Sequence, residues 1–166
     1  MNANRSERDL RRDVADEPDR HHPKHGVHLI NGQPTIVFGT VCSKDRAPWL
    51  ATDEVHTILR DVWQQADTWL MGRYVIMPDH IHFFAGWTGQ EIELDNWITY
   101  WKSQFSKQHR QPVYRWQTDH WDTRMRTVAI YEEKWVYVLN NPVRHGLVTR
   151  AEDWPYRGEI CALRWD

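Results

Sequence analysis

Hydrophobic and polar positions in the middle of the chain follow patterns typical of alternating strands and helices. The β-branched run TIVFGTV predicts a strand over residues 35–41, which the polar KDRAP segment ends. Apolar residues then recur at helical spacing in EVHTILRDVWQQA, so we expect a helix over 54–66 with Asp53 as its N-cap. Two further strands are predicted, WLMGRYVIM over 69–77 and HIHFFAGW over 80–87, with a tight turn at PD between them.

A second helix, a fourth strand and a last helix are expected after these elements. The segment LDNWITYWKSQFSKQ predicts a helix over 94–108, with an apolar stripe made by Leu94, Trp97, Ile98, Trp101 and Phe105. A fourth strand is predicted over Val113–Gln117. The last helix is expected over Ile130–Asn140, and it should stop near Pro142 because proline disfavours helical backbone there.

The order of these elements predicts the fold class. A β-α-β-β-α-β order followed by one more helix indicates an α+β protein with the ferredoxin-like split βαβ plan. In that plan an antiparallel sheet of four to five strands carries two helices on one face. The other face of the sheet is then available for chemistry, and the C-terminal helix is an addition to the plan.

The first 33 residues read as a polar extension that we expect to be flexible. They are charged and then run into PDRHHPKHGVH, which has two prolines and no apolar period. Four histidines could hold a metal there: His21, His22, His25 and His28. Because they have no carboxylate or cysteine partners nearby, we interpret this cluster as incidental.

The composition is that of one packed domain. The chain has 166 residues and 20.0 kDa, of which 40% are hydrophobic, and its eleven tryptophans favour a dense core despite a low mean hydropathy. Cys42 and Cys161 are too few for a disulfide scaffold or a cysteine-rich zinc site. No apolar segment approaches the ~20 residues of a membrane span or resembles a signal peptide. We therefore expect a cytoplasmic protein with no membrane partner.

The charge is unevenly distributed along the chain. The net charge is −2, but residues 1–99 carry 10 basic and 15 acidic side chains, whereas residues 100–166 carry 11 basic and 8 acidic ones. In the C-terminal part, basic and aromatic residues alternate in YWKSQFSKQHRQPVYRWQTDHWDTRMR. Such a mixture suits phosphate contacts and base stacking on single strands. The alternative interpretation is a solvated charged helix followed by a loop.

Two histidines in VIMPDHIHFF are the first candidates for chemistry. Side chains alternate along a strand, so His80, His82 and Phe84 should share one side while Ile81 and Phe83 face the other. That arrangement is a paired ligand geometry. The alternative is that both are half-exposed strand histidines satisfied by solvent or by hydrogen bonds.

The last helix contains two tyrosines with different surroundings. At about 100° per residue, Tyr131 falls on the apolar stripe and is expected in the core, whereas Tyr137 lies roughly opposite it. Asn141 follows Tyr137 by four residues, which would place its carboxamide one turn from the phenol if the helix continues that far. The alternative for Asn141 is a residue at the helix end that bonds to local backbone.

Together these residues resemble a known family. The chain is similar to the HUH single-strand endonucleases, specifically to the REP-associated tyrosine transposases and the related single-tyrosine insertion-sequence transposases. The motifs that carry the resemblance are YVIMPDHIHFF, WQTDHWDTRMR, YVLNNPVRHGLV and EDWPY, and they cover most of residues 34–158. Asp79 stands where the family often has Asn, and His145 where it often has Ala. Neither is expected to be a ligand or a nucleophile.

The resemblance implies a mechanism and a division of the chain. Residues 34–150 would form the catalytic domain, and residues 151–166 a tail that packs on or near it. His80, His82 and Asn141 would hold a divalent ion, Mg²⁺ or Mn²⁺, and Tyr137 would attack phosphorus to form a 5′-phosphotyrosine link. Two imidazoles and a carboxamide suit Mn²⁺ better than Mg²⁺ by softness, and zinc would fit the nitrogens too.

The implied substrate is single-stranded DNA at or near a palindromic hairpin. Basic residues predicted to contact the DNA backbone are Lys102, Arg115, Arg124, Arg126 and Arg144. Trp116 or Trp121 is predicted to stack on bases. Asp122 would instead order the loop that carries these tryptophans. Each of these side chains has an alternative role in packing or on the solvated surface.

Two other functions remain open at this point. The same fold could act as a hairpin or single-stranded DNA-binding module with little cleavage, or as a metal-dependent hydrolase that uses an activated water. The protein is expected to act as a monomer or a homodimer.

Overall fold

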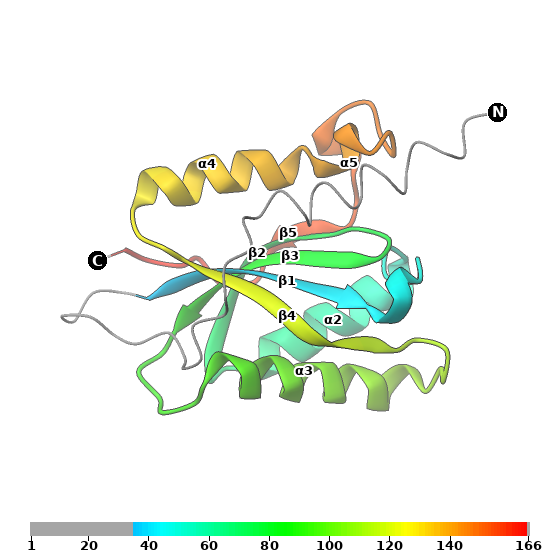
Figure 1. Ribbon diagram of the computed structural model, residues 1–166, viewed down its shortest axis with the longest axis horizontal. Coiled ribbons are helices and arrows are strands. Elements are labelled where there is room, and N and C mark those ends of the chain that lie inside the picture. Colours follow the sequence, from blue (N-terminus) through cyan, green and yellow to red (C-terminus); the bar gives the residue numbers. More distant parts are fainter. Residues whose placement is uncertain (1–34, 166) are drawn as a thin grey trace.

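The computed structural model describes residues 35–165 (Figure 1), so the polar extension and its four histidines lie outside the described residues. The main elements are β1 Ile36–Ser43, α2 Asp53–Gln65, β2 Trp69–Ile76, β3 His80–Trp87, α3 Leu94–His109, β4 Trp116–Met125, α4 Val128–Leu139, α5 Asn141–Arg144 and β5 Arg157–Glu159. Two short 3₁₀ turns are η1 Lys44–Arg46 and η2 Ala151–Asp153. No helix within 35–165 is long and apolar enough to cross a membrane.

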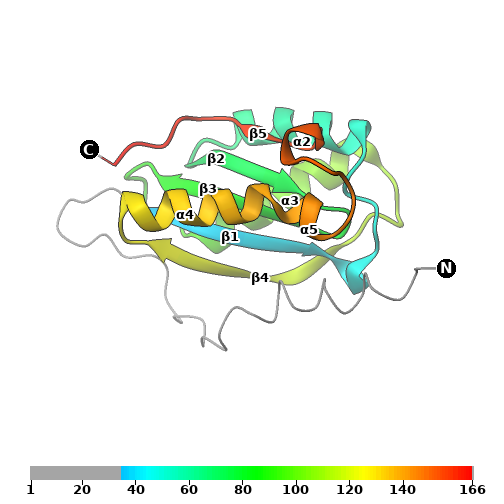
Figure 2. The ribbon, with the colours of Figure 1, turned by 90° about the horizontal axis from the view of Figure 1, so that it is seen from above.

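A single antiparallel sheet organises these elements into three layers. The strand order is β4-β1-β3-β2-β5, and every pair of neighbours is antiparallel. Helices α2 and α3 cover one face, and α4 crosses the other, as Figures 1 and 2 show from two directions. The predicted α+β class and the antiparallel sheet with a tyrosine-bearing helix are confirmed.

The face under α2 and α3 holds the larger core. All five members of the predicted stripe on α3 are buried there: Leu94, Trp97, Ile98, Trp101 and Phe105. Tryptophan rings from both helices meet edge to face, as Trp63 and Trp101 do with centroids 5.7 Å apart. Because these rings bury large apolar areas, this core stabilises the sheet from the α2/α3 side.

Helix α4 is anchored to the other face by Tyr131. Its ring meets Phe84 of β3 at a centroid distance of 4.6 Å and an interplanar angle of 65°. Tyr131 is 4% exposed, as its place on the apolar stripe predicts, whereas Tyr137 is 43% exposed. At the helix start the Thr127 hydroxyl accepts a hydrogen bond from the Ile130 amide. The packing of one side of α4 therefore turns Tyr137 away from the core.

Two local predictions are wrong. The fourth strand lies at Trp116–Met125 rather than Val113–Gln117, because an edge strand needs hydrogen bonds on one side only and tolerates the polar sequence WQTDHWDTRM. The N-cap of α2 is Thr52 rather than Asp53: the Thr52 hydroxyl accepts from the Val55 amide, and Asp53 is the first helical residue.

The C-terminal residues add a strand that the sequence pattern did not predict. Residues Arg157–Glu159 form β5, which pairs with β2 through Arg73↔Glu159 and Val75↔Arg157. The indole of Trp154 donates a hydrogen bond to the Ile76 carbonyl at 2.9 Å. Residues 157–159 thus extend the sheet at the edge of β2.

Candidate metal and tyrosine site

His80 and His82 lie side by side on the α4 face of β3. Their ring centroids are 4.7 Å apart, and the residues are 0% and 5% exposed. Ile81 and Phe83 point into the α2/α3 core instead, as the alternation predicts. Because both rings are buried, the alternative of half-exposed strand histidines is wrong.

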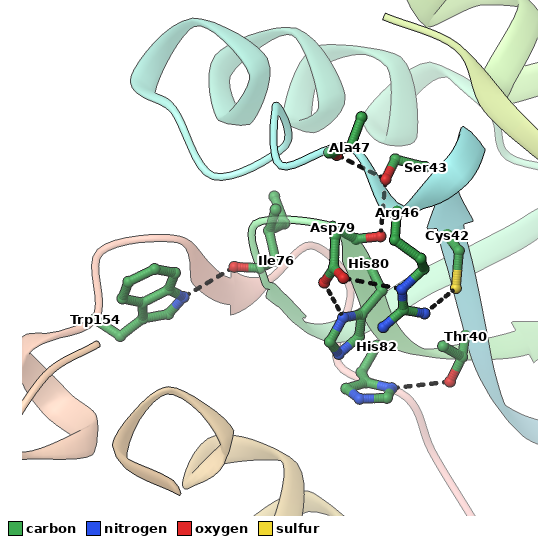
Figure 3. A network of polar contacts seen from close by, with 10 residues as sticks. All are labelled: Thr40, Cys42, Ser43, Arg46, Ala47, Ile76, Asp79, His80, His82 and Trp154. Carbon is green, nitrogen blue, oxygen red and sulfur yellow. Dashed lines mark hydrogen bonds and ion pairs between the residues drawn. The ribbon is translucent and has the colours of Figure 1, made fainter. Parts of the chain in front are cut away.

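His80 is held by a chain of charged groups (Figure 3). Its Nδ1 lies 2.7 Å from the Asp79 carboxylate, and the other oxygen of that carboxylate accepts from Arg46 Nε at 2.9 Å. Although burial alone would raise the pKa of Asp79, the bond from His80 and the charge of Arg46 hold that pKa below its usual value. An ionised Asp79 accepts a hydrogen bond from Nδ1–H of His80, so the free lone pair of the His80 ring lies on Nε2.

The turn that carries Asp79 is fixed to β1 and to the segment after it. The Ser43 amide donates to the Asp79 carbonyl and the Leu50 amide to the Pro78 carbonyl, both at 3.0 Å. In η1, Asp45 and Arg46 have φ of 56° and 57°, a left-handed backbone that costs non-glycine residues about 1 kcal/mol each. This strained turn aims Arg46 at Asp79, and Arg46 also donates to Cys42 Sγ at 2.9 Å.

His82 has a neutral partner. Its Nδ1 lies 2.8 Å from the Thr40 hydroxyl on the neighbouring strand, and its ring stacks on Phe38 with centroids 5.3 Å apart. Burial lowers the pKa of His82 well below its usual value, and nearby positive charges lower it further. Burial also lowers the pKa of His80. Both rings are therefore neutral at physiological pH, which is the form that binds metals.

The donor atoms of this site fit a divalent metal. The Nε2 atom of His80 is buried and has no hydrogen-bond partner among the residues that the structure describes. Such an atom is costly unless a ligand or an ion satisfies it. Asn141, the predicted third ligand, is fully buried, and its Oδ1 accepts from Arg144. A carbonyl oxygen has two lone pairs, so this bond leaves one for an ion.

Tyr137 stands on α4 among positive charges. The Arg144 guanidinium lies 3.8 Å from the centre of the Tyr137 ring and also donates to the Tyr137 carbonyl at 2.8 Å. The ammonium of Lys134 is 5.7 Å from the same ring. Helix α4 ends at Leu139, but the chain continues helically into α5, so Asn141 is an N-terminal residue of α5 rather than the end of one long helix. Arg144 contacts both Tyr137 and Asn141.

The tyrosine and the histidines are connected through these cations. Lys134 lies 4.7 Å above the Phe38 ring, which itself stacks on His82. The charges of Lys134 and Arg144 also contribute to the lowered pKa of His82, after burial and the neighbouring His80. The predicted nucleophile and the predicted metal ligands are therefore on the same side of one sheet, within one chain.

The predicted DNA contacts fall in different places. Residues that pair across antiparallel strands share a face. Trp121 pairs with Thr40 and so lies on the face of His82, whereas Arg124 pairs with Val37 and points to the α2/α3 side. Arg126 is exposed just beyond the end of β4. Asp122 belongs to β4 rather than to a loop.

Lys102 does not have the exposure that a DNA contact needs. It is 8% exposed, and its ammonium donates to the Gln117 carbonyl at 2.8 Å. Burial lowers the pKa of Lys102 to about 8. The helical pattern placed this residue off the apolar stripe, but β4 extends over it and excludes water. We therefore assign Lys102 to the packing of α3 against β4.

Substituting Lys102 by methionine should stabilise the protein at pH 7, by about 1–3 kcal/mol, because the buried charge is removed. Between pH 8 and 10.5 the native state has lost the Lys102 proton while the unfolded chain keeps it, so wild-type stability rises relative to the variant. The advantage of the variant should therefore shrink above pH 8. Urea unfolding of both proteins at pH 7 and pH 10 measures the difference in their free energy of unfolding. Weaker binding of DNA by the variant would contradict the assignment and show that Lys102 contacts DNA.

A second group of metal-type side chains lies at another place. The Nε2 atom of His120 is 3.0 Å from Asp95 and 3.2 Å from Asp122, and one ligand atom from each residue lies within 4.8 Å of the others. Asp95 belongs to α3, so this cluster is on the α2/α3 side of the sheet. The contacts of His120 with its two carboxylate partners explain the geometry without an ion.

Arg46 and Thr40 are site residues that sequence reasoning missed. Thr40 lies on β1, 42 residues before His82, and Arg46 lies in the turn after β1, 33 residues before Asp79. Pairing of β1 with β3 brings Thr40 opposite His82 and Cys42 opposite His80. No local signal could have found them, because the contact depends on strand register.

Comparison with solved structures finds a protein that shares this fold. A solved structure of a REP-associated tyrosine transposase bound to a REP hairpin superimposes with a TM-score of 0.68 at 20% identity, covering 86% of this chain and 95% of that one. This likeness shows that the two share a fold. No protein-family model matches the chain.

Sequence relatives establish the family. A REP-associated tyrosine transposase of Escherichia coli is 30% identical over 130 residues, which span 72% of this chain and 73% of that protein. A relative from Haemophilus influenzae described under the same family name is 28% identical over 136 residues, 73% of this chain and 77% of that protein. The chain belongs to the REP-associated tyrosine transposase family.

Proposed function

We propose that this protein is a metal-dependent endonuclease and strand transferase that cuts single-stranded DNA at or near a palindromic hairpin. One observation carries the proposal: Tyr137 lies on the same side of the sheet as His80 and His82, and Lys134 connects the two groups. Family membership supports it, and so does the REP hairpin bound by the structural relative.

The reaction uses the phenol oxygen of Tyr137 as the nucleophile, and the phenol gives up its proton to solvent. It forms a bond to the phosphorus of the scissile phosphate, and the bond from phosphorus to the 3′ oxygen of the preceding nucleotide breaks. That oxygen takes up a proton and leaves as a 3′-hydroxyl, while the phosphate stays on Tyr137 as a 5′-phosphotyrosine. Attack by a 3′-hydroxyl reverses the step and joins strands.

His80, His82 and Asn141 would hold Mg²⁺ or Mn²⁺ in this reaction. A bound divalent ion would polarise the phosphate and offset its charge. The residues of the chain do the rest: Asp79 and Thr40 orient the two rings, and Arg144 holds Asn141 and the Tyr137 backbone. Arg144 and Lys134 also offer positive charge to an incoming phosphate.

All of these groups belong to one chain, so a monomer is sufficient for the proposed reaction. The remaining contacts that we propose for the hairpin are Trp121, which lies on the α4 face, and Arg126. A non-catalytic hairpin-binding module would have no use for the unsatisfied Nε2 of His80 or for a tyrosine held among cations.

The proposed function is tested by incubating the protein with a hairpin oligonucleotide that has single-stranded flanks, in the presence of Mn²⁺. A product that migrates as a covalent protein–DNA adduct on a denaturing gel is expected. Binding of the hairpin without any adduct, with Mg²⁺ as well as Mn²⁺, would favour the binding module.

Replacing Asp79 should weaken metal binding indirectly, because Asp79 contacts His80 and is not itself a proposed ligand. The Asp79→Ala variant is expected to lose about 10–100-fold in Mn²⁺ affinity, because nothing then fixes the Nδ1 proton of His80. Asp79→Asn keeps an acceptor oxygen but not the charge, so its loss should be smaller. Calorimetry with Mn²⁺ measures the affinities, and the ¹⁵N shifts of His80 report its tautomer. Equal affinities in all three proteins would contradict the role assigned to Asp79.

A further inference from the structure

Two adjoining hollows lie beyond the end of β1, next to the candidate metal site. One, of about 560 Å³, is lined by η1 and the start of β4, and the other, of about 500 Å³, by the end of α3 and the segment after it. They share Arg115 and Trp116, so they adjoin each other. We call the two hollows together the basic groove. Each hollow has a volume typical of ligand sites.

The groove is positively charged at one end. Its basic residues are Lys44, Arg46, Arg110 and Arg115. Two acidic residues, Asp45 and Asp119, line the first hollow only. Positive charge is therefore concentrated around Arg115 and Arg110, where several phosphates could be bound along a strand.

Aromatic side chains lie between these charges. Tyr114 lines the second hollow, and its ring stacks on Trp49 with centroids 4.8 Å apart and an angle of 8°. One face of Tyr114 is thus held rigidly, and the ring is half-buried. Trp116 lines both hollows and packs its edge against Trp101 and Phe105. Fixed aromatic rings next to arginines are the arrangement on which unpaired bases stack.

Arg46 connects the groove to the metal site. It lines the first hollow, and its guanidinium bonds Asp79, the partner of His80. A DNA strand whose phosphate lies at His80 and His82 can therefore continue past Arg46 into the groove. The strand must be single, because bases that stack on Tyr114 and Trp116 cannot be paired.

We propose that the basic groove binds the single-stranded DNA that flanks the scissile phosphate. This rests on the proposed function for the position of that phosphate, and it adds the path of the strand. It also gives a role to Arg115, which lies just before β4. It adds Arg110 and Tyr114, which belong to the basic and aromatic segment of the sequence but were not singled out there.

The test is a binding measurement in EDTA, where no cleavage occurs. Three probes are compared by fluorescence anisotropy: a blunt hairpin, the same hairpin with a 5′ single-stranded extension, and the same hairpin with a 3′ extension. The wild-type protein is expected to bind one of the extended probes about tenfold more tightly than the blunt hairpin. No gain with either extension would overturn the proposal.

The variant Arg110→Ala/Arg115→Ala should remove that gain and leave the affinity for the blunt hairpin unchanged. The slope of log affinity against log salt for the extended probe should become shallower by about 0.7 for each phosphate that the variant no longer neutralises. The control Arg150→Ala/Arg164→Ala removes two exposed arginines outside both hollows and should keep the gain. A gain that survives in the groove variant, or an equal loss for all three probes, would overturn the proposal.

These results are separable from the proposed chemistry. If a covalent adduct forms but the groove variant keeps the gain, the groove proposal fails and the proposed function stands. If the groove variant loses the gain but no adduct ever forms, the groove binds the strand and the proposed chemistry fails.

Discussion

Replacing Tyr137 by phenylalanine is expected to reduce formation of the covalent protein–DNA adduct by at least about 1,000-fold, because the variant has no oxygen that can attack phosphorus. Binding of the hairpin should be nearly unchanged, since the ring remains and still packs under Arg144. Denaturing gels and mass spectrometry of the adduct measure the first effect, and anisotropy the second.

The matched control is Tyr100→Phe. Tyr100 is 50% exposed and lies on α3, on the other side of the sheet, so its loss should leave the adduct intact. If Tyr137→Phe still cuts DNA, and neither Tyr137→Phe nor Tyr100→Phe forms an adduct, the enzyme uses water and Tyr137 is structural. An adduct that persists in Tyr137→Phe and is lost in Tyr100→Phe would place the nucleophile on α3.

Removing a metal ligand should have the second large effect. His82→Ala is expected to lower Mn²⁺ affinity by more than about 100-fold and to abolish the adduct, since one of two imidazole ligands is gone. Hairpin binding in EDTA should remain, because it does not depend on the ion. Calorimetry and the adduct assay measure the two losses.

His120→Ala is the control for His82→Ala. His120 belongs to the cluster with Asp95 and Asp122, the other place in residues 35–165 where metal-type side chains meet. Its loss should leave Mn²⁺-dependent adduct formation unchanged. The opposite pattern, with activity lost in His120→Ala and kept in His82→Ala, would move the functional metal to that cluster.

Much of the fold could be predicted because its signals are local. The third strand follows from the alternation in HIHFFAGW, and the stripe on α3 from apolar residues at helical spacing. The contrast between Tyr131 and Tyr137 follows from the same spacing. The period of two along a strand also predicted that the two histidines share one face.

Features that depend on contacts distant in sequence could not be predicted. The polar strand β4 is held by its pairing with β1, and β5 by its pairing with β2. Lys102 is buried only because β4 covers it. Arg46 reaches Asp79 through a left-handed turn that no glycine marks. In each case the tertiary context outweighs local preference.

The account depends on an ion at His80, His82 and Asn141, beside Tyr137. Crystals soaked in Mn²⁺ and measured for anomalous scattering test this most directly. A peak about 2.2 Å from Nε2 of both histidines, on the side that faces Tyr137, is the predicted result. A peak only between Asp95, His120 and Asp122, or none near the two histidines, would contradict it.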